Sequence, residues 1–229
     1  MDERAVDVVF RGLDRGVEGG REQHYERSLA LADAQRDEVL LAYAMNGAPL
    51  PPAHGFPLRL IVPGWYGMAS VKWLRSITAV AEPFEGVQQT LLYNFRRSAD
   101  EPGERVTRQR PRSVMAPPGI PEFLSRVRHV RPGRNTVRGR AWSGQGPIHR
   151  VEFSADGGTT WTDARLEPAA SRHGWAAWSY DWDAAPGEHE LCVRATDAAG
   201  DSQPQQPDDG WNLSGYAVNA IQRVTVRVA

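Results

Sequence analysis

Residues 38–74 read EVLLAYAMNGAPLPPAHGFPLRLIVPGWYGMASVKWL, a stretch in which short apolar runs alternate with turn residues. Within it, PLRLIVPG at 57–64 predicts a strand that ends at Pro63-Gly64, because proline and glycine interrupt regular structure. A tight turn should follow, and 71–82 is the next strand candidate. The stretch therefore predicts short strands joined by tight loops, and such loops are where ligand-binding side chains usually lie.

The sequence on either side of this stretch is mixed in character. An apolar run at 5–12 is compatible with a buried strand, whereas 25–35 is short and typical of a helix. Residues 37–47 begin with acids and end in Asn-Gly, which suits either a helix or a short strand closed by a turn. Residues 98–125 are polar and then rich in proline and arginine, so we expect a connection between domains that could also follow a surface.

Residues 126–229 have a different pattern, in which short alternating runs are separated by turn signals. The sequence Asp156-Gly157-Gly158 is a strong hairpin signal. This pattern predicts a β-sandwich of the immunoglobulin type. The candidate strands are TVRGRAW, HRVEFSADGGTTW, AAWSYDW, HELCVRATDAAG and QRVTVRV.

Composition bounds the classes of function. The 229 residues suffice for one large domain or two ordinary ones, and a net charge of −1 gives no reason to expect a nucleic-acid partner or a membrane surface. The chain contains no apolar run long enough to span a membrane and no signal-peptide core, so the expected location is cytoplasmic by default.

Cys192 is the only cysteine, which excludes an intrachain disulfide and a four-cysteine zinc site. Because side chains alternate along a strand, Cys192 points away from the face that carries Leu191 and Val193. We therefore interpret it as a structural thiol and not as a nucleophile.

Several segments resemble the sulfite oxidase family of molybdenum-cofactor oxidoreductases, in the family's order and over most of the chain. The resemblance implies an α+β fold class, with part of a molybdopterin-binding domain at 1–104 and an immunoglobulin-like dimerisation domain at 105–229. It also implies a homodimer formed through the sandwich and oxygen-atom transfer on sulfite or a similar small oxyanion. The segments are GLD at 12–14, residues 38–74, AWSG at 141–144, SADGGTTW at 154–161 and WNLSGYAVNAIQRVTV at 211–226.

The molybdenum cofactor is a pterin with a phosphate or nucleotide tail, so its site needs cations and hydrogen-bonding groups. Arg59 lies in an apolar run, where an unpaired charge is costly, and Lys72 is the only lysine in the chain. Their alternative roles are a salt bridge for Arg59 and a solvated strand end for Lys72. The resemblance assigns cofactor contacts to Asp14, His54, Arg59, Ser70, Val71 and Lys72.

Two of these assignments, and that of a tyrosine, have structural alternatives as well. His54 could be a loop histidine bonded to backbone, and Asp14 an ordinary turn residue. The resemblance places Tyr93 as the active-site tyrosine, and its alternative is a core aromatic on a strand.

Two departures from the family matter for activity. The family's metal ligand is a cysteine thiolate, but Cys192 has the wrong sequence context, so no residue of this chain is assigned as a metal ligand. Ala176 or Ala177 stands where the family's substrate-binding arginine is expected. We therefore expect the chain alone to be inactive.

The alternative function is a non-catalytic dimerisation or interaction module. The chain could be a truncated gene product, one part of a split enzyme with a missing N-terminal half as partner, or a degenerate homologue. No heme-binding segment is found in the sequence. A carbohydrate-binding sandwich would leave 38–74 unexplained.

Overall fold

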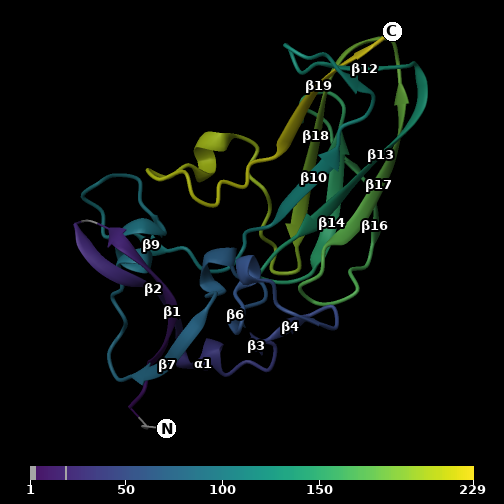
Figure 1. Cartoon of the computed structure of the whole chain (residues 1–229). Helices are drawn as coiled ribbons and strands as arrows, with labels where there is room; N and C mark the ends of the chain where they lie inside the picture. Colours follow the sequence, from purple (N-terminus) through teal and green to yellow (C-terminus); the bar gives the residue numbers. More distant parts are fainter. Residues whose placement is uncertain (1–3, 19) are drawn as a thin grey trace. The chain divides into compact units, whose positions relative to one another are not determined.

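The computed structural model describes residues 4–18 and 20–229. The described chain is mostly β-sheet with few helices (Figure 1). It divides into two compact units. The first contains Met1–Thr107 together with Asn212–Tyr216, and the second contains Arg108–Trp211 together with Ala217–Ala229. None of the described helices is both long enough and apolar enough to cross a membrane.

A three-stranded antiparallel sheet organises the first unit, in the order β2-β1-β7. Its strands are β1 (Asp7–Glu18), β2 (Arg21–Ala30) and β7 (Leu74–Val80). The strands expected at 5–12 and 71–82 are thereby confirmed. The core of the unit is an apolar cluster of buried side chains. Its members are Val8, Phe10, Leu29, Leu60, Val62, Trp65, Ala69, Val71 and Leu74.

The helix predicted at 25–35 is wrong for most of its length. Residues up to Ala30 belong to β2, and only Leu31–Ala34 form a helix, α1. In β2, Arg27 lies opposite Phe10 of β1, and Leu29 is buried in the apolar cluster. Backbone pairing with β1 therefore overrides the local helical preference.

Short strands and turns fill the rest of the first unit. β3 (Leu40–Ala42) pairs with β6 (Arg59–Ile61), and β4 (Ala44–Met45) pairs with β5 (Ala48–Pro49). Asn46 and Gly47 link β4 to β5 with φ angles of 52° and 80°, as a two-residue hairpin turn requires. Of the two structures that suited 37–47, the strand closed by a turn is therefore observed. The remaining elements are η1 (Pro52–His54), η2 (Gly67–Ala69), η3 (Gln88–Leu92), β8 (Asn94–Phe95) and β9 (Glu104–Arg105).

Two sheets form the second unit. One has the order β10-β13-β17-β16 and the other β11-β12-β19-β18-β14-β15. The four strands of the first are β10 (Arg112–Ala116), β13 (Gly133–Trp142), β17 (Ala176–Ala184) and β16 (Arg165–Glu167). The six of the second are β11 (Ile120–Pro121), β12 (Arg128–Val130), β19 (Gln222–Val228), β18 (Gly187–Asp197), β14 (Ile148–Ser154) and β15 (Thr162–Asp163). A short helix, η4 (Pro207–Gly210), precedes β19.

The two sheets share one apolar core. Val137 and Trp178 reach it from the four-stranded sheet, and Val151, Leu191 and Val226 reach it from the six-stranded sheet. The unit is therefore a two-layer β-sandwich, and each of the five candidate strands overlaps an observed strand, although β14 ends at Ser154 while its candidate extends to Trp161. The proposed connection at 98–125 is not a free linker, because β9, β10 and β11 lie within it.

Candidate functional site

Three separate segments of the first unit meet around Gly55. Gly55 has a φ of 103°, and a Cβ atom there would lie 2.9 Å from the Cβ of Lys72 and 3.1 Å from that of Arg59. The backbone N–H of Trp73 donates to the Gly55 carbonyl at 3.3 Å, and that of Leu13 donates to the Trp73 carbonyl at 2.9 Å. The absence of a side chain at 55 thus lets Arg59 and Lys72 approach each other.

The Arg59 guanidinium bonds to backbone carbonyls. Nη1 donates to the His54 oxygen at 3.1 Å and Nη2 to the Ser70 oxygen at 3.5 Å. Its Nε is buried and has no hydrogen-bond partner. Within the described chain, no carboxylate pairs with Arg59, so the salt bridge considered as its alternative role is not observed. Arg59 therefore keeps unused capacity to bind an anion.

Lys72 and Trp73 also bind carbonyl groups of the short helix η1. Lys72 Nζ donates to the Ala53 carbonyl at 3.1 Å and lies 4.5 Å from the centre of the Trp73 ring. Trp73 Nε1 donates to the Pro52 carbonyl at 2.9 Å. The three carbonyls of η1 are thus each bonded to a different side chain, which fixes the loop that carries His54.

The roles of His54, Ser70 and Val71 differ. The His54 side chain is exposed, and no bond to its ring is seen among the described residues. Ser70 Oγ accepts a hydrogen bond from the Val62 N–H at 3.1 Å. Val71 is buried in the apolar cluster, and its carbonyl accepts from the Leu60 N–H at 2.8 Å. Val71 therefore positions Ser70 and Lys72 on either side of it.

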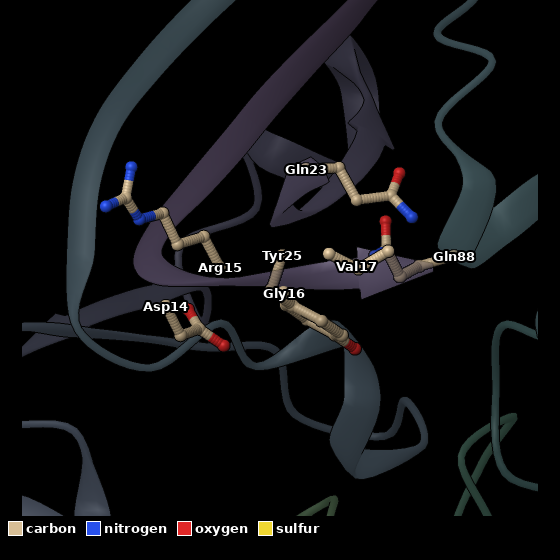
Figure 2. A pocket seen from close by; sticks show the side chains of 7 residues that line it. All are labelled: Asp14, Arg15, Gly16, Val17, Gln23, Tyr25 and Gln88. Carbon is tan, nitrogen blue, oxygen red and sulfur yellow. The ribbon is translucent and has the colours of Figure 1, made fainter. Parts of the chain in front are cut away.

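Asp14 borders a cavity of about 320 Å³ in the first unit (Figure 2). Its Oδ1 is buried without a hydrogen-bond partner. Tyr25, which also lines the cavity, donates from its hydroxyl to the Met68 carbonyl at 2.7 Å, two residues before Ser70. In Figure 2 the guanidinium of Arg15 points away from the amide groups of the cavity. The full lining is Asp14, Arg15, Gly16, Val17, Gln23, Tyr25 and Gln88.

Gln23, Tyr25 and Gln88 were not singled out from the sequence. Gln23 and Tyr25 are two positions apart on β2, so their side chains share one face of the strand. That alternation is a weak signal, and here it was hidden by the prediction of a helix starting at residue 25.

Tyr93 lies apart from the group around Gly55. It follows η3, and its backbone N–H donates to the Gln88 carbonyl at 3.1 Å. The same carbonyl accepts a hydrogen bond from Arg27 Nη1 at 2.6 Å. The Arg27 guanidinium lies 5.6 Å from the centre of the Tyr93 ring. Gln88, which lines the cavity, is therefore the residue that joins Tyr93 to the region of Asp14.

Arg27 is a buried cation, only 2% exposed. Burial lowers its pKa, because the low-dielectric surroundings disfavour the charged form. Its second hydrogen bond runs from Nη2 to the Val106 carbonyl at 3.5 Å. The positive charge is thus held by carbonyl groups and the Tyr93 ring.

Cys192 belongs to β18 of the second unit and is fully buried. Burial raises the pKa of its thiol to about 11, so the thiol keeps its proton at neutral pH. This environment agrees with a structural thiol. Across the described ranges, no group of three or more His, Cys, Asp or Glu side chains is placed to hold a metal ion.

Two family models match the chain, and together they define a molybdenum-cofactor oxidoreductase. The oxidoreductase molybdopterin binding domain matches residues 1–88, and the Mo-co oxidoreductase dimerisation domain matches residues 111–229. The chain belongs to the sulfite oxidase family of molybdenum-cofactor oxidoreductases, as its resemblance to that family predicted.

Individual relatives agree with this family. The mitochondrial sulfite oxidase of Homo sapiens is 36% identical over 240 residues, which cover 99% of this chain and 43% of that protein. The sulfite oxidase of Arabidopsis thaliana is 34% identical over 241 residues, covering 98% of this chain and 60% of the plant protein. The sulfane dehydrogenase SoxCD of Paracoccus pantotrophus has a similar structure, with a TM-score of 0.81 and 28% identity over 99% of this chain and 58% of that one. The chain thus spans about half the length of these relatives.

Proposed function

We propose that the first unit binds the pterin and phosphate part of a molybdenum cofactor, as part of an enzyme that transfers an oxygen atom to or from sulfite or a similar small oxyanion. The observation that carries the proposal is the cluster around Gly55. Arg59 and Lys72 converge there, and no carboxylate within the described chain neutralises either cation. Two convergent cations without anionic partners favour a phosphate-bearing ligand.

The buried polar atoms without partners also fit this ligand. Arg59 Nε is a free donor and Asp14 Oδ1 a free acceptor, and a pterin edge carries groups of both kinds. We propose that Arg59 and Lys72 bind the phosphate, that Asp14, His54 and Ser70 orient the pterin, and that Val71 holds Ser70 and Lys72 in place. Tyr93 is proposed as the residue near the reacting oxygen. When bound, the cofactor supplies the two-electron oxygen-atom transfer.

The metal-binding thiolate is proposed to come from outside this chain. Cys192 is the only cysteine, and a buried thiol with a raised pKa cannot act as a soft anionic ligand at neutral pH. This favours a second candidate function, in which the chain is a non-catalytic dimerisation or interaction module. Both candidates leave the chain inactive alone and without a heme group of its own.

We further propose that the second unit is an immunoglobulin-type sandwich and that it forms a homodimer. The orders β10-β13-β17-β16 and β19-β18-β14 reproduce the strand order of the two immunoglobulin sheets when the seven strands are read in sequence. The match of 111–229 to a dimerisation domain supports self-association. We also propose that residues 1–104 are part of a molybdopterin-binding domain. The fold of the whole family enzyme is proposed to be of the α+β class.

The test is pterin content of the purified chain after incubation with molybdenum cofactor released from a heat-treated enzyme. Oxidation converts bound pterin to a fluorescent product, and elemental analysis gives the molybdenum. The variants Arg59→Gln and Lys72→Gln should lower bound pterin at least tenfold, because each removes one of the two cations. Arg75→Gln is the matched control, since Arg75 is an exposed arginine on the nearby strand β7.

Each result has a definite reading. Pterin retained by the parent chain and by Arg75→Gln, and lost from the other two variants, supports the proposal. If the parent chain retains no pterin, cofactor binding is contradicted, and the non-catalytic interaction module is the candidate function that remains. Stoichiometric molybdenum in this chain alone would overturn the requirement for an external thiolate.

A further inference from the structure

A short hairpin lies at one edge of the six-stranded sheet. β11 pairs with β12 through Ile120 with His129 and through Pro121 with Arg128. The hairpin, beside the label β12 in Figure 1, turns between these strands over residues 122–127. Its turn is closed by a backbone hydrogen bond of 2.8 Å from the Glu122 N–H to the Val127 carbonyl.

The base of the hairpin is held in one conformation. Arg128 donates from Nε to the Pro118 carbonyl at 2.8 Å, and from Nη2 to the Pro117 carbonyl at 2.9 Å and the Gly119 carbonyl at 2.5 Å. Gly119 has a φ of 67°, and a Cβ atom there would lie 2.0 Å from the His129 carbonyl oxygen. The Arg128 guanidinium thus holds the carbonyls of three consecutive residues. The last of these residues, Gly119, has a backbone conformation and a close contact that only glycine can accommodate.

The tip of this ordered hairpin is apolar. Ile120, Phe123 and Leu124 are 75%, 79% and 87% exposed, and the last two are the most exposed large apolar side chains of the residues that the structure describes. Arg126 extends its guanidinium to 5.6 Å from the Phe123 ring. Surface loops are usually polar, and adjacent exposed apolar side chains mark a contact surface. An apolar tip on a rigid base needs little reordering to bind a partner.

The surroundings of the tip suit a second copy of this chain. In a two-fold dimer, the same surface patch of each copy takes part in the contact. An apolar patch can pack against its equivalent on the second copy, whereas a patch of one charge would be repelled by its equivalent. Beside the hairpin, Arg227 of β19 is paired with Glu188 at 2.7 Å, so this cation is neutralised within the chain. Pro121 has no N–H, so extension of the sheet by strand pairing is disfavoured there and side-chain packing is the available mode.

We propose that the apolar tip formed by Ile120, Phe123 and Leu124 is a contact through which two copies of this chain associate. The inference rests on the proposed homodimer and adds the surface that forms it. Three side chains provide only part of a stable interface, which buries roughly 800 Å² on each partner. They would be the desolvated centre on which the affinity depends most.

The experiment compares the parent chain with the double variant Phe123→Ser, Leu124→Ser. Sedimentation equilibrium over a concentration series gives the dimer dissociation constant of each. We expect the constant to rise by at least about 30-fold in the double variant, the effect of losing a central apolar contact. The matched control is Tyr43→Ser, which removes a side chain of the first unit that is 74% exposed.

Folding of the variants is checked by far-ultraviolet circular dichroism, and the spectra should match that of the parent because the replaced side chains are exposed within the single chain and hold none of its core. The single variant Leu124→Gln provides a second, milder change should the double variant fail to fold. A dimeric double variant with the parent's dissociation constant would overturn the hairpin as a contact and leave the homodimer intact. A parent chain that is monomeric at every concentration would contradict the homodimer itself, and the hairpin contact with it.

Discussion

The ring of Tyr216 lies 5.0 Å from the ring of Tyr93, centre to centre, with a tilt of 41° between their planes. Tyr216 belongs to Asn212–Tyr216, a segment of the first unit whose flanking residues on both sides belong to the second. The Leu213 N–H also donates to the Arg96 carbonyl at 2.6 Å. The proposed active-site tyrosine is therefore supported by a segment more than a hundred residues away in sequence.

Replacing Tyr216 tests this support. Tyr216→Ala removes the aromatic contact, and we expect it to lower the free energy of unfolding by about 1 kcal/mol, because a half-buried aromatic pair still stabilises beyond its buried area. Tyr216→Phe keeps the ring and should stay close to the parent. Chemical denaturation measures both variants. Equal stability of Tyr216→Ala and Tyr216→Phe would show that the ring contact does not contribute.

Gly55→Ala should damage the cluster by two separate effects. Its φ of 103° disfavours any side chain, and the added Cβ would also press on Lys72 at 2.9 Å. We expect a loss of about 2–4 kcal/mol in unfolding free energy together with loss of pterin binding. Gly133→Ala is the matched control, because Gly133 has a similar φ of 96° but open space around it, and should cost about 1–2 kcal/mol. If Gly55→Ala loses no more unfolding free energy than Gly133→Ala, the close approach of Lys72 to residue 55 does not require a glycine there.

The buried thiol of Cys192 predicts a dependence of stability on alkaline pH. Its pKa is raised from the ordinary value of 9.0 to about 11, so between these values the unfolded chain releases a proton that the folded chain keeps. The contribution to stability is complete below pH 9 and is lost as the pH rises towards 11, at up to about 1.4 kcal/mol per pH unit. Urea unfolding of the parent and of Cys192→Ala at pH 8 and pH 10 measures it. The parent should lose more stability between the two pH values than Cys192→Ala, and parallel losses would contradict the raised pKa.

Asp156 organises the loop after β14 through its carboxylate. It accepts hydrogen bonds from the backbone N–H groups of Thr159 and Thr160, at 3.0 and 2.9 Å, and from the hydroxyls of Ser154 and Thr160. These bonds hold the pKa of Asp156 well below its usual range. A depressed carboxyl pKa contributes stability above the ordinary value, and that contribution is lost as the pH falls through the depressed value.

The variant Asp156→Asn should therefore melt at a lower temperature than the parent at pH 7. The difference should shrink as the pH is lowered below the ordinary aspartate range. Asp183→Asn, a change at an exposed aspartate of β17, serves as the control and should leave the melting temperature unchanged. Equal melting temperatures of parent and Asp156→Asn at pH 7 would rule out the loop as a source of stability.

The strands of the second unit could be predicted because their signal is local. Val224, Val226 and Val228 alternate with polar residues along β19, and two of them reach the shared core. In β2 the same reasoning failed, because Tyr25 to Ala30 form a strand only through pairing with β1. Local propensity cannot report a partner strand that is distant in the sequence.

Part of the candidate site could likewise be predicted from the sequence, and part of it could not. His54, Arg59, Ser70, Val71 and Lys72 lie within one short stretch, so a sequence motif could bring them together by resemblance. One cavity brings Asp14 close to Gln23, Tyr25 and Gln88. This proximity arises only because β1 pairs with β2 and because Gln88 of η3 reaches the same cavity.

The sequence by itself determined the family, the β-rich second half and the residue types of the candidate cofactor site, since each depends on residues close together in the chain. Only the tertiary structure decided that Gly55 brings Arg59 and Lys72 together, that Cys192 is buried, and that Tyr216 joins Tyr93 in the first unit. The physical reason is that burial and contact between distant residues arise from packing of the whole chain, which no local pattern contains.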